Sequence, residues 1–386
     1  MSEYQYYEFQ ALDRPLSADD RAALRAVSTR ARITSRAFTN WYDWGDFKGS
    51  PDAFMDRWFD LHLYLANWGT RRLMVRLPSL ALEGRDIAAL VRRIPYARLR
   101  TSGENTILDI EREELEDDLE DISRYDDDEE SSYGTGWLAA MAPLRVDALA
   151  GNLRLFYLLW LFLVEDGAAG DDEVEPLPGI GPVDEAAEAF AAFFKLDRDL
   201  LAAAAEGAPE PEAGKDAVRA AIESMPVSDK DVVLSRLAAG DPLAAAALQA
   251  AIRERLGPPP SGRRTVGALR RRAVEIARER RLAEARRAEE QRRRNAEARE
   301  QARRKRLDLV ARQGESAWSE VDAQIERRNA SGYDRAAQLI ADLRQIALER
   351  GALEAFESRL GAILEPRAGK QKILDRLRNI EKRDAA

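Results

Sequence analysis

The spacing of apolar side chains changes along the chain, and each change predicts a different kind of structure. Up to residue 112, apolar runs with a period of two alternate with helical runs, and Gly-, Pro-, Asp- and Ser-containing turns separate them. We therefore expect a small mixed α/β domain over residues 1–112, with the element order β-α-β-α-β-α-ββ and the helices on one face of a sheet. The expected strands are residues 4–12, 33–44, 71–77, 99–100 and 107–110, and the expected helices are residues 18–27, a helix from Pro51 with the apolar stripe Phe54, Trp58, Leu61 and Leu65, and residues 86–93.

Residues 113–136 interrupt this pattern with twelve Asp or Glu side chains. They lack the Asp-x-Asp-x-Asp-Gly order of a calcium-binding loop. High charge with few apolar residues is typical of a solvated segment, so we expect an acidic linker here.

From residue 137 to 257 the apolar spacing is helical throughout and predicts a helical domain. Residues 144–164 are apolar on nearly all sides, which is typical of one buried central helix. After Gly314 the spacing predicts a C-terminal helical module over residues 315–386. Further helices are expected near residues 183–206, 215–224, 228–239 and 242–256 of the domain, and near residues 318–325, 333–350, 353–364 and 370–382 of the module.

Residues 263–313, between the two helical regions, predict one long helix rich in Arg and Glu. The segment has no glycine or proline between Gly267 and Gly314, and strong helix formers dominate it. Opposite charges recur three or four residues apart, as in Glu289 and Arg293, and each such pair stabilises a helix by about 0.2–0.5 kcal/mol. The whole chain is therefore expected to be an α+β protein: a small sheet domain, a helical middle, a long charged helix and a helical module.

Arginine recurs every eleven residues along the long helix, at Arg270, Arg281, Arg292 and Arg303. Eleven residues make three helical turns, so these side chains lie on nearly one face. Three interpretations stay open: a solvated helix with its own ion pairs, a helix that lies against a partner, and a contact with nucleic acid. The sequence does not decide between a single rod and a coiled coil.

The net charge of −9 is unevenly distributed. Residues 263–306 hold 18 basic and 7 acidic side chains, or +11, so the rest of the chain carries about −20. This distribution favours a contact between the basic helix and an acidic surface, either of this chain or of a partner. A general nucleic-acid-binding protein would usually be basic overall, so nucleic acid is the less favoured partner.

Several classes of chemistry lack the residues that they need. The chain has no cysteine and one histidine, His62, which excludes thiolate metal sites, multi-histidine metal sites and cysteine nucleophiles. No phosphate-binding glycine loop, paired-carboxylate motif or nucleophile elbow is present. We expect no cofactor and no metal, and the sequence favours a non-enzymatic protein without settling the question.

The N-terminal residues do not have the order of a signal peptide. The most apolar run, residues 153–164, is shorter than the roughly twenty residues of a membrane-spanning helix. We therefore expect a cytoplasmic protein without a membrane contact.

Two groups of residues are the candidate partner-binding sites. The first is a loop bounded by glycine, in which Trp44, Asp46, Phe47 and Lys48 offer aromatic surface and both signs of charge. His62 is expected to be a packed or surface residue and not an acid–base group. A domain core explains the aromatic cluster better than a surface that stacks nucleobases or a peptide; the cluster consists of Trp41, Tyr42, Trp44, Phe47, Trp58 and Trp68. The second group is a set of arginines on the long helix: Arg270, Arg281, Arg292, Arg299 and Arg303.

Three motifs in the N-terminal region are distinctive: Tyr4-Gln-Tyr-Tyr-Glu-Phe-Gln-Ala-Leu-Asp-Arg-Pro-Leu16, Trp44-Gly-Asp-Phe-Lys-Gly49 and Ala66-Asn-Trp-Gly-Thr-Arg-Arg72. In these motifs, and through residues 224–240, the chain resembles an uncharacterised family of bacterial proteins, which implies no assigned chemistry. The tail, with Tyr333-Asp-Arg-Ala-Ala337 and Asp342-Leu-Arg344, is similar to the C-terminal helices of bacterial zinc-finger proteins of the SWIM type. The Cys and His ligands of those proteins are absent, so this similarity implies a shared helical interaction module without metal.

These observations favour a non-enzymatic bacterial scaffold or adaptor that holds modules apart and binds a protein partner of unknown identity. The alternative is a nucleic-acid-associated factor that uses the arginines of the long helix. A third hypothesis is an enzyme with an unfamiliar carboxylate site within residues 1–112, which a deep pocket with acids of perturbed pKa would support. The oligomeric state is not predicted.

Overall fold

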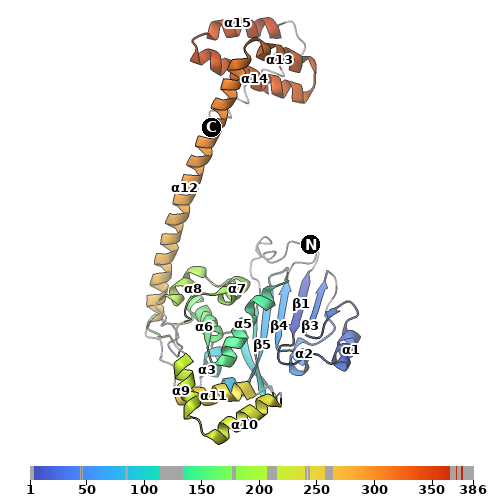
Figure 1. Cartoon of the computed structure of the whole chain (residues 1–386), viewed down its shortest axis with the longest axis vertical. Coiled ribbons are helices and arrows are strands. Elements are labelled where there is room, and N and C mark those ends of the chain that lie inside the picture. The colour runs from blue at the N-terminus through green and yellow to red at the C-terminus, as the bar shows by residue number, and fades with distance from the viewer. Residues whose placement is uncertain are drawn as a thin grey trace. The chain divides into compact units, whose positions relative to one another are not determined.

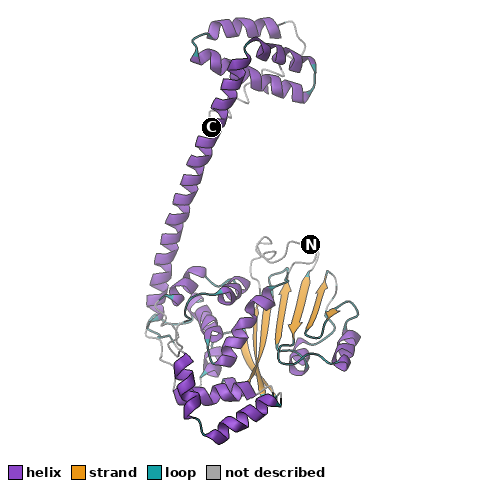
Figure 2. Cartoon of the chain, viewed as in Figure 1, coloured by secondary structure: helices purple, strands orange, loops and turns teal. Residues whose placement is uncertain are grey.

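Seven short strands in the first 112 residues form one antiparallel sheet. They are β1 (Gln5–Gln10), β2 (Arg32–Ile33), β3 (Ala37–Tyr42), β4 (Leu61–Ala66), β5 (Arg71–Pro78), β6 (Ala97–Ser102) and β7 (Asn105–Arg112). Their order in the sheet is β2-β3-β1-β4-β5-β7-β6 (Figure 1). The two-residue loop between β6 and β7 begins at Gly103, whose φ of 59° favours glycine. The expected α+β class is confirmed, since helices make up the rest of the fold in Figure 2.

The structure is a computed structural model. It describes residues 4–43, 45, 47–82, 86–113, 134–175, 180–206, 215–239, 241, 244–256, 264–365, 371 and 375–376.

Strand β4 replaces the second half of the helix that we expected from Pro51. Helix α2 (Pro51–Arg57) begins as expected, with Ser50 as its N-terminal cap, but it ends seven residues after it starts. Leu61 and Leu65 lie in β4, where they face one core and alternate with His62. The helical prediction was wrong because a spacing of four residues fits one helical turn and also two strand periods.

Helices cover both faces of the sheet, whereas the sequence pattern predicted helices on one face only. On one face, Leu63 and Val75 join a core with the helices that follow the sheet in sequence. On the other face, Phe9 and Met74 pack with residues of α2 and of helix α1 (Ala18–Val27). Strands covered on both sides carry apolar residues on both sides, so the simple alternation of a half-exposed strand is lost.

The apolar segment that we expected as one helix over residues 144–164 forms two helices. Helix α5 (Trp137–Ala150) ends at Gly151, whose φ of 90° is left-handed, and α6 (Arg154–Glu165) follows after a bend of 110°. Residues 155–164 of α6 are all buried, so this helix lies at the centre of the core. Among the described helices, none alone is long and apolar enough to cross a membrane, although α5 and α6 together pass that test by length and composition.

Contacts divide the chain into two compact units, residues 1–280 and 281–386. In the described part of the first unit, the other helices are the 3₁₀ helix η1 (Ser79–Ala81), α3 (Ile87–Arg92), α7 (Glu185–Phe194), α8 (Arg198–Ala205), α9 (Lys215–Ser224), α10 (Val227–Ala238) and α11 (Ala244–Leu256). The regions that we separated as 1–112 and 137–257 both lie in this unit, and side chains of the sheet and of α5–α8 form one hydrophobic cluster. Of the expected linker over 113–136, residues 114–133 lie outside the described residues.

The long helix is continuous as α12 (Val266–Gln313). Its first turns belong to the first unit, where Val266 and Leu269 join the core. Its last turns belong to the second unit, where Leu307 and Val310 join another core. One helix therefore contributes buried side chains to both units.

Among the described residues of the second unit, three further helices accompany the end of α12. Apolar stripes that the sequence predicted are buried in them, including Val321 and Ile325 of the first helix and Ile340 of the second. Of the helix expected at residues 370–382, most positions lie outside the described residues. The three helices are α13 (Glu315–Glu326), α14 (Ala330–Glu349) and α15 (Leu353–Leu364).

Candidate functional site

The base of α12 is held in the first unit through Arg264, which precedes the helix. Its guanidinium forms an ion pair with Glu175 and donates to the backbone oxygens of Ala203 at 2.8 Å and Ala204 at 2.7 Å. Glu175 is only 3% exposed, and it also accepts a hydrogen bond from the hydroxyl of Tyr157 at 2.9 Å. This cluster joins the start of α12 to both α6 and α8.

Further arginines continue the attachment along the first four turns of α12. Arg270 donates to the backbone oxygen of Val164, near the end of α6, at 2.8 Å. Arg280 forms a bidentate ion pair with Asp199, with N–O distances of 3.0 and 2.8 Å. Arg270, which the sequence suggested as a partner-binding residue, thus makes contacts within its own unit.

Arginines bind the carboxyl ends of three successive helices in the first unit. Arg270 binds the end of α6, Arg71 binds the end of α7 through the backbone oxygen of Ala192 at 3.3 Å, and Arg264 binds the end of α8. The last carbonyl groups of a helix have no partner within the helix, and they carry the negative end of its dipole. A guanidinium, with five N–H groups and a permanent charge, satisfies both needs.

In the middle of α12, at the start of the second unit, every side chain from residue 281 to 302 is exposed. Seven arginines and five glutamates lie in this stretch, so its charge is nearly balanced. Ion pairs one turn apart join some of them, such as Arg294 and Glu290 at 2.6 Å. Of the predicted partner-binding residues, Arg281, Arg292 and Arg299 are exposed here, and Arg303, just beyond, is half-buried at 3.5 Å from Glu300.

The glycine-bounded loop, which was the first of the two predicted partner-binding sites, contributes to the core. Phe47 is half-buried, and its ring centroid lies 5.3 Å from that of Phe54. Lys48 is exposed, whereas Trp44 and Asp46 lie outside the described residues. Of the four predicted side chains, the structure therefore places two: Phe47 packs into the core and Lys48 is exposed.

His62 is a core residue, where the sequence had left a packed and a surface position open. It is 0% exposed, its ring stacks on Phe9 with centroids 4.0 Å apart, and its Nδ1 lies 3.0 Å from the backbone oxygen of Glu8. Burial lowers the pKa of His62 from 6.5 to about 3, so the imidazole is neutral at ordinary pH. The expectation that the neighbouring aromatic cluster forms a core is wrong for Trp41 and Trp68, which are 42% and 47% exposed.

A cavity of about 520 Å³ at the ends of β6 and β7 is where the hypothesis of a carboxylate site in residues 1–112 can be tested. Asp109 and Glu111 line it. Burial acts to raise the pKa of Asp109, but Arg72 at 2.8 Å and Arg98 at 2.6 Å outweigh it and lower that pKa. An acid held ionised by two arginines is a poor proton donor, so this cavity gives the enzyme hypothesis no support.

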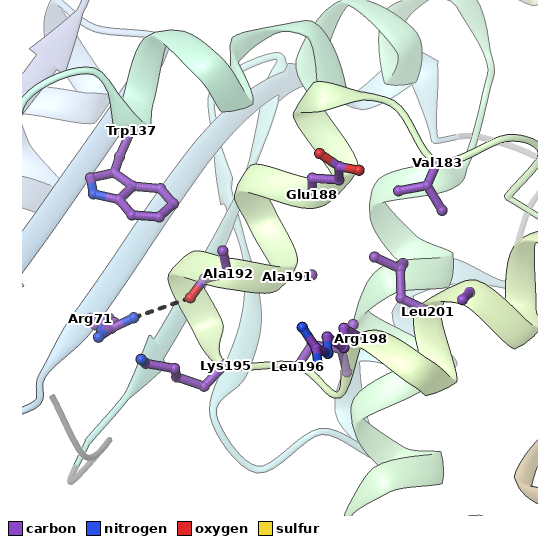
Figure 3. A pocket seen from close by; sticks show the side chains of 11 residues that line it. Arg71, Trp137, Val183, Glu188, Ala191, Ala192, Lys195, Leu196, Arg198 and Leu201 are labelled. Carbon is purple, nitrogen blue, oxygen red and sulfur yellow. Dashed lines mark hydrogen bonds between the residues drawn. The ribbon is translucent and has the colours of Figure 1, made fainter. Parts of the chain in front are cut away.

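A larger cavity, of about 690 Å³, opens beside the carboxyl end of α7 (Figure 3). Its walls come from β5, the start of α5, and both α7 and α8. Seven of its eleven lining residues are apolar, among them Trp137, Val183, Leu196 and Leu201. The charged lining residues are three cations and one acid: Arg71, Lys195, Arg198 and Glu188.

Lys195 reaches this cavity because of an unusual backbone conformation. It ends α7 in the left-handed region with φ of 56°, a position where glycine is the usual residue. No glycine or proline separates α7 from α8, so the sequence pattern predicted one helix over residues 183–206 and gave no sign of the cavity. In the structure α7 ends at Lys195, and residues of both α7 and α8, among them Ala192 and Leu201, line the cavity.

Among the residues that the structure describes, no group of three or more His, Cys, Asp or Glu side chains is arranged to hold a metal ion. The comparisons with known proteins add no template for a site: the search of protein-family models, the search of curated proteins and the search of solved structures each gave no match. The resemblances noted in the sequence therefore stay predictions.

Proposed function

We propose that this chain is a non-enzymatic bacterial adaptor, in which two folded units that bind protein partners are joined by a helix with an exposed middle. One observation carries the proposal: the two ends of α12 are built into two separate cores, whereas residues 281–302 are exposed on all sides. A helix is a stiffer connection than a Gly/Ser-rich linker, and this stretch of 22 residues corresponds to about 33 Å at 1.5 Å per residue.

The way in which the two ends of α12 are fixed supports the same proposal. At the start, Arg264 pairs with Glu175, which is 3% exposed. At the far end, Arg306 pairs at 2.8 Å with Asp342, which is also 3% exposed. In both pairs the carboxylate is buried and the arginine is partly exposed. Loss of either arginine would leave a buried carboxylate without its ion pair, so each pair ties its end of the helix to its unit.

A second candidate function is association with nucleic acid, and the exposure of Arg281, Arg292 and Arg299 favours it. The five glutamates of the same stretch weigh against it. Binding of phosphates depends on an excess of positive charge, and the exposed stretch has only a small one.

Two variants of the full-length chain separate these candidates. The first deletes residues 285–295, which shortens the exposed stretch by three whole turns and keeps the helical phase of both ends. The second replaces four arginines by glutamine: Arg281, Arg292, Arg299 and Arg303. Both are compared with the unchanged chain as bait in an extract of the native host, with captured proteins identified by mass spectrometry after crosslinking.

For an adaptor, we expect the glutamine variant to capture the same proteins as the unchanged chain. The deletion variant should capture each partner but crosslink fewer pairs of partners in one complex. Capture of no protein above a control bait would contradict the adaptor. Binding of oligonucleotides that weakens with salt, and that the glutamine variant loses, would favour the nucleic-acid candidate instead.

The resemblance of the N-terminal motifs to a bacterial family, and of the tail to a helical interaction module, belongs to this proposal. So does a location in the cytoplasm. The resemblances rest on the motifs, including Tyr333-Asp-Arg-Ala-Ala337 of the tail, and the location rests on the order of the N-terminal residues and the short apolar run at residues 153–164.

A further inference from the structure

We infer that the cavity beside α7 binds a small organic anion with an apolar body, of the class of medium-chain carboxylates. This inference is independent of the adaptor proposal, because the cavity lies wholly within the first unit. Its volume of about 690 Å³ falls within the range of about 300–1,000 Å³ that is usual for small-molecule sites. The balance of apolar walls and a few charged groups is also usual for such sites.

The charges that line the cavity favour an anion. Arg71, Lys195 and Arg198 outnumber the one acid, Glu188. In the view of Figure 3, Ala192 and the chain around it separate Glu188 from the three cations. A carboxylate in this cavity would therefore meet three cationic side chains and one acidic side chain.

Burial strengthens the effect of one of the cations, Arg71. Arg71 is 2% exposed, and its guanidinium lies over the ring of Phe193 at 5.7 Å from the centroid. Charge interactions are several times stronger at a site that excludes water than in bulk solvent. A planar guanidinium also matches the geometry of a carboxylate.

The apolar walls select the rest of the ligand. Trp137 is 3% exposed, and Leu196 and Leu201 are buried beside the cavity. An alkyl or aromatic body would replace water against these side chains, which a free inorganic phosphate cannot do. A nucleotide would leave its sugar and base without polar partners on the apolar wall.

The backbone at Lys195 is a second and independent observation. Among the described residues, only Lys195 and Arg328 are non-glycine residues with positive φ, at 56° and 50°. A side chain held in this region is disfavoured relative to glycine, so it persists where its side chain contributes something that glycine cannot. At Lys195 that contribution is a cation at the wall of an apolar cavity.

The test is isothermal titration calorimetry of the full-length chain with decanoate below its micelle concentration. Decanol and decylammonium serve as probes of the same length without charge or with the opposite charge. We expect saturable binding of decanoate, at least tenfold weaker binding of decanol and no binding of decylammonium, since one charge-assisted hydrogen bond corresponds to about tenfold in affinity or more.

Three variants locate the binding site. Lys195→Gly removes the cation and suits the left-handed backbone, so we expect an intact fold and about tenfold weaker binding. Ala202→Phe fills the cavity from a half-buried position and should abolish binding. Arg328→Gly is the matched control, because it removes a cation from the other left-handed residue, in the second unit, and should leave decanoate binding unchanged.

Far-UV circular dichroism on each variant shows whether it is folded. The inference is overturned if decanoate does not bind, if decanol binds as tightly as decanoate, or if folded Lys195→Gly binds decanoate with unchanged affinity. Equal loss of binding in Arg328→Gly would also overturn it, because the effect would then reflect net charge rather than this cavity.

Discussion

Replacement of Arg264 by methionine should destabilise the first unit strongly. The change leaves the carboxylate of Glu175, which is 3% exposed, without its guanidinium, and it leaves the backbone oxygens of Ala203 and Ala204 without that donor. Breaking a buried ion pair by removing one partner costs about 3–5 kcal/mol. Because the side chain of Arg264 is itself 28% exposed, we expect a value at the lower end, about 3 kcal/mol.

Two further variants show whether the uncompensated charge is the cause. Arg281→Met removes an exposed arginine from the same helix and should change the free energy of unfolding by less than about 0.5 kcal/mol. The double variant Arg264→Met with Glu175→Gln removes both charges. It should recover at least half of the loss, about 1.5 kcal/mol, because the amide is less costly to bury than an unpaired carboxylate.

Hydrogen–deuterium exchange across a guanidinium chloride series, resolved by peptide, measures these effects in each unit separately. Peptides from residues 154–175 and 198–206 should lose protection in Arg264→Met, whereas peptides from residues 330–349 should not. A cost below about 1 kcal/mol, or a double variant as unstable as the single one, would refute the reasoning that a buried pair anchors the base of α12.

Three more predictions concern single features of the fold. Replacing both Ala288 and Ala296 by glycine should lower the local stability of the helix by about 2 kcal/mol and leave the unfolding of both units unchanged, since neither side chain is buried. Circular dichroism measures the loss of helix, and hydrogen–deuterium exchange measures each unit; unfolding of a whole unit would contradict the prediction. His62 is neutral in the folded state with a pKa of about 3 against 6.5 unfolded, so its contribution is present above pH 6.5 and is lost as pH falls toward 3. Between pH 7 and pH 5 the unchanged chain should lose about 2 kcal/mol more than His62→Leu in chemical denaturation, and parallel pH profiles would contradict this. Gly134 has φ of 98°, and a Cβ added to it would lie 2.5 Å from the buried ring of Tyr6, so Gly134→Ala should lower the free energy of unfolding by about 2–4 kcal/mol in denaturant titrations. Gly103 also has positive φ but open space around it, so Gly103→Ala should lower it by about 1 kcal/mol.

Local pattern alone determined the parts of this protein whose contacts are short in sequence. The long helix follows from a run of helix formers without glycine or proline and from charge pairs one turn apart. Helix α1 follows from Ser17, whose hydroxyl caps the first turn while Asp20 bonds back to it. The stripes of α13 and α14 also follow from spacing, because each helix buries one face and exposes the other.

Only tertiary contacts decided the features that bring distant residues together. Leu61 and Leu65 fit a helix or a strand equally by spacing, and pairing of β4 with β1 and β5 made them a strand. Arg71 donates a hydrogen bond to the backbone oxygen of Ala192, 121 residues later in the sequence, and the periodicity of neither segment predicts that contact. The cavity beside α7 is lined by residues of β5, α5, α7 and α8, with Lys195 in the left-handed region where α7 ends. Which of these elements meet depends on the packing of the whole core and cannot be read from the local pattern.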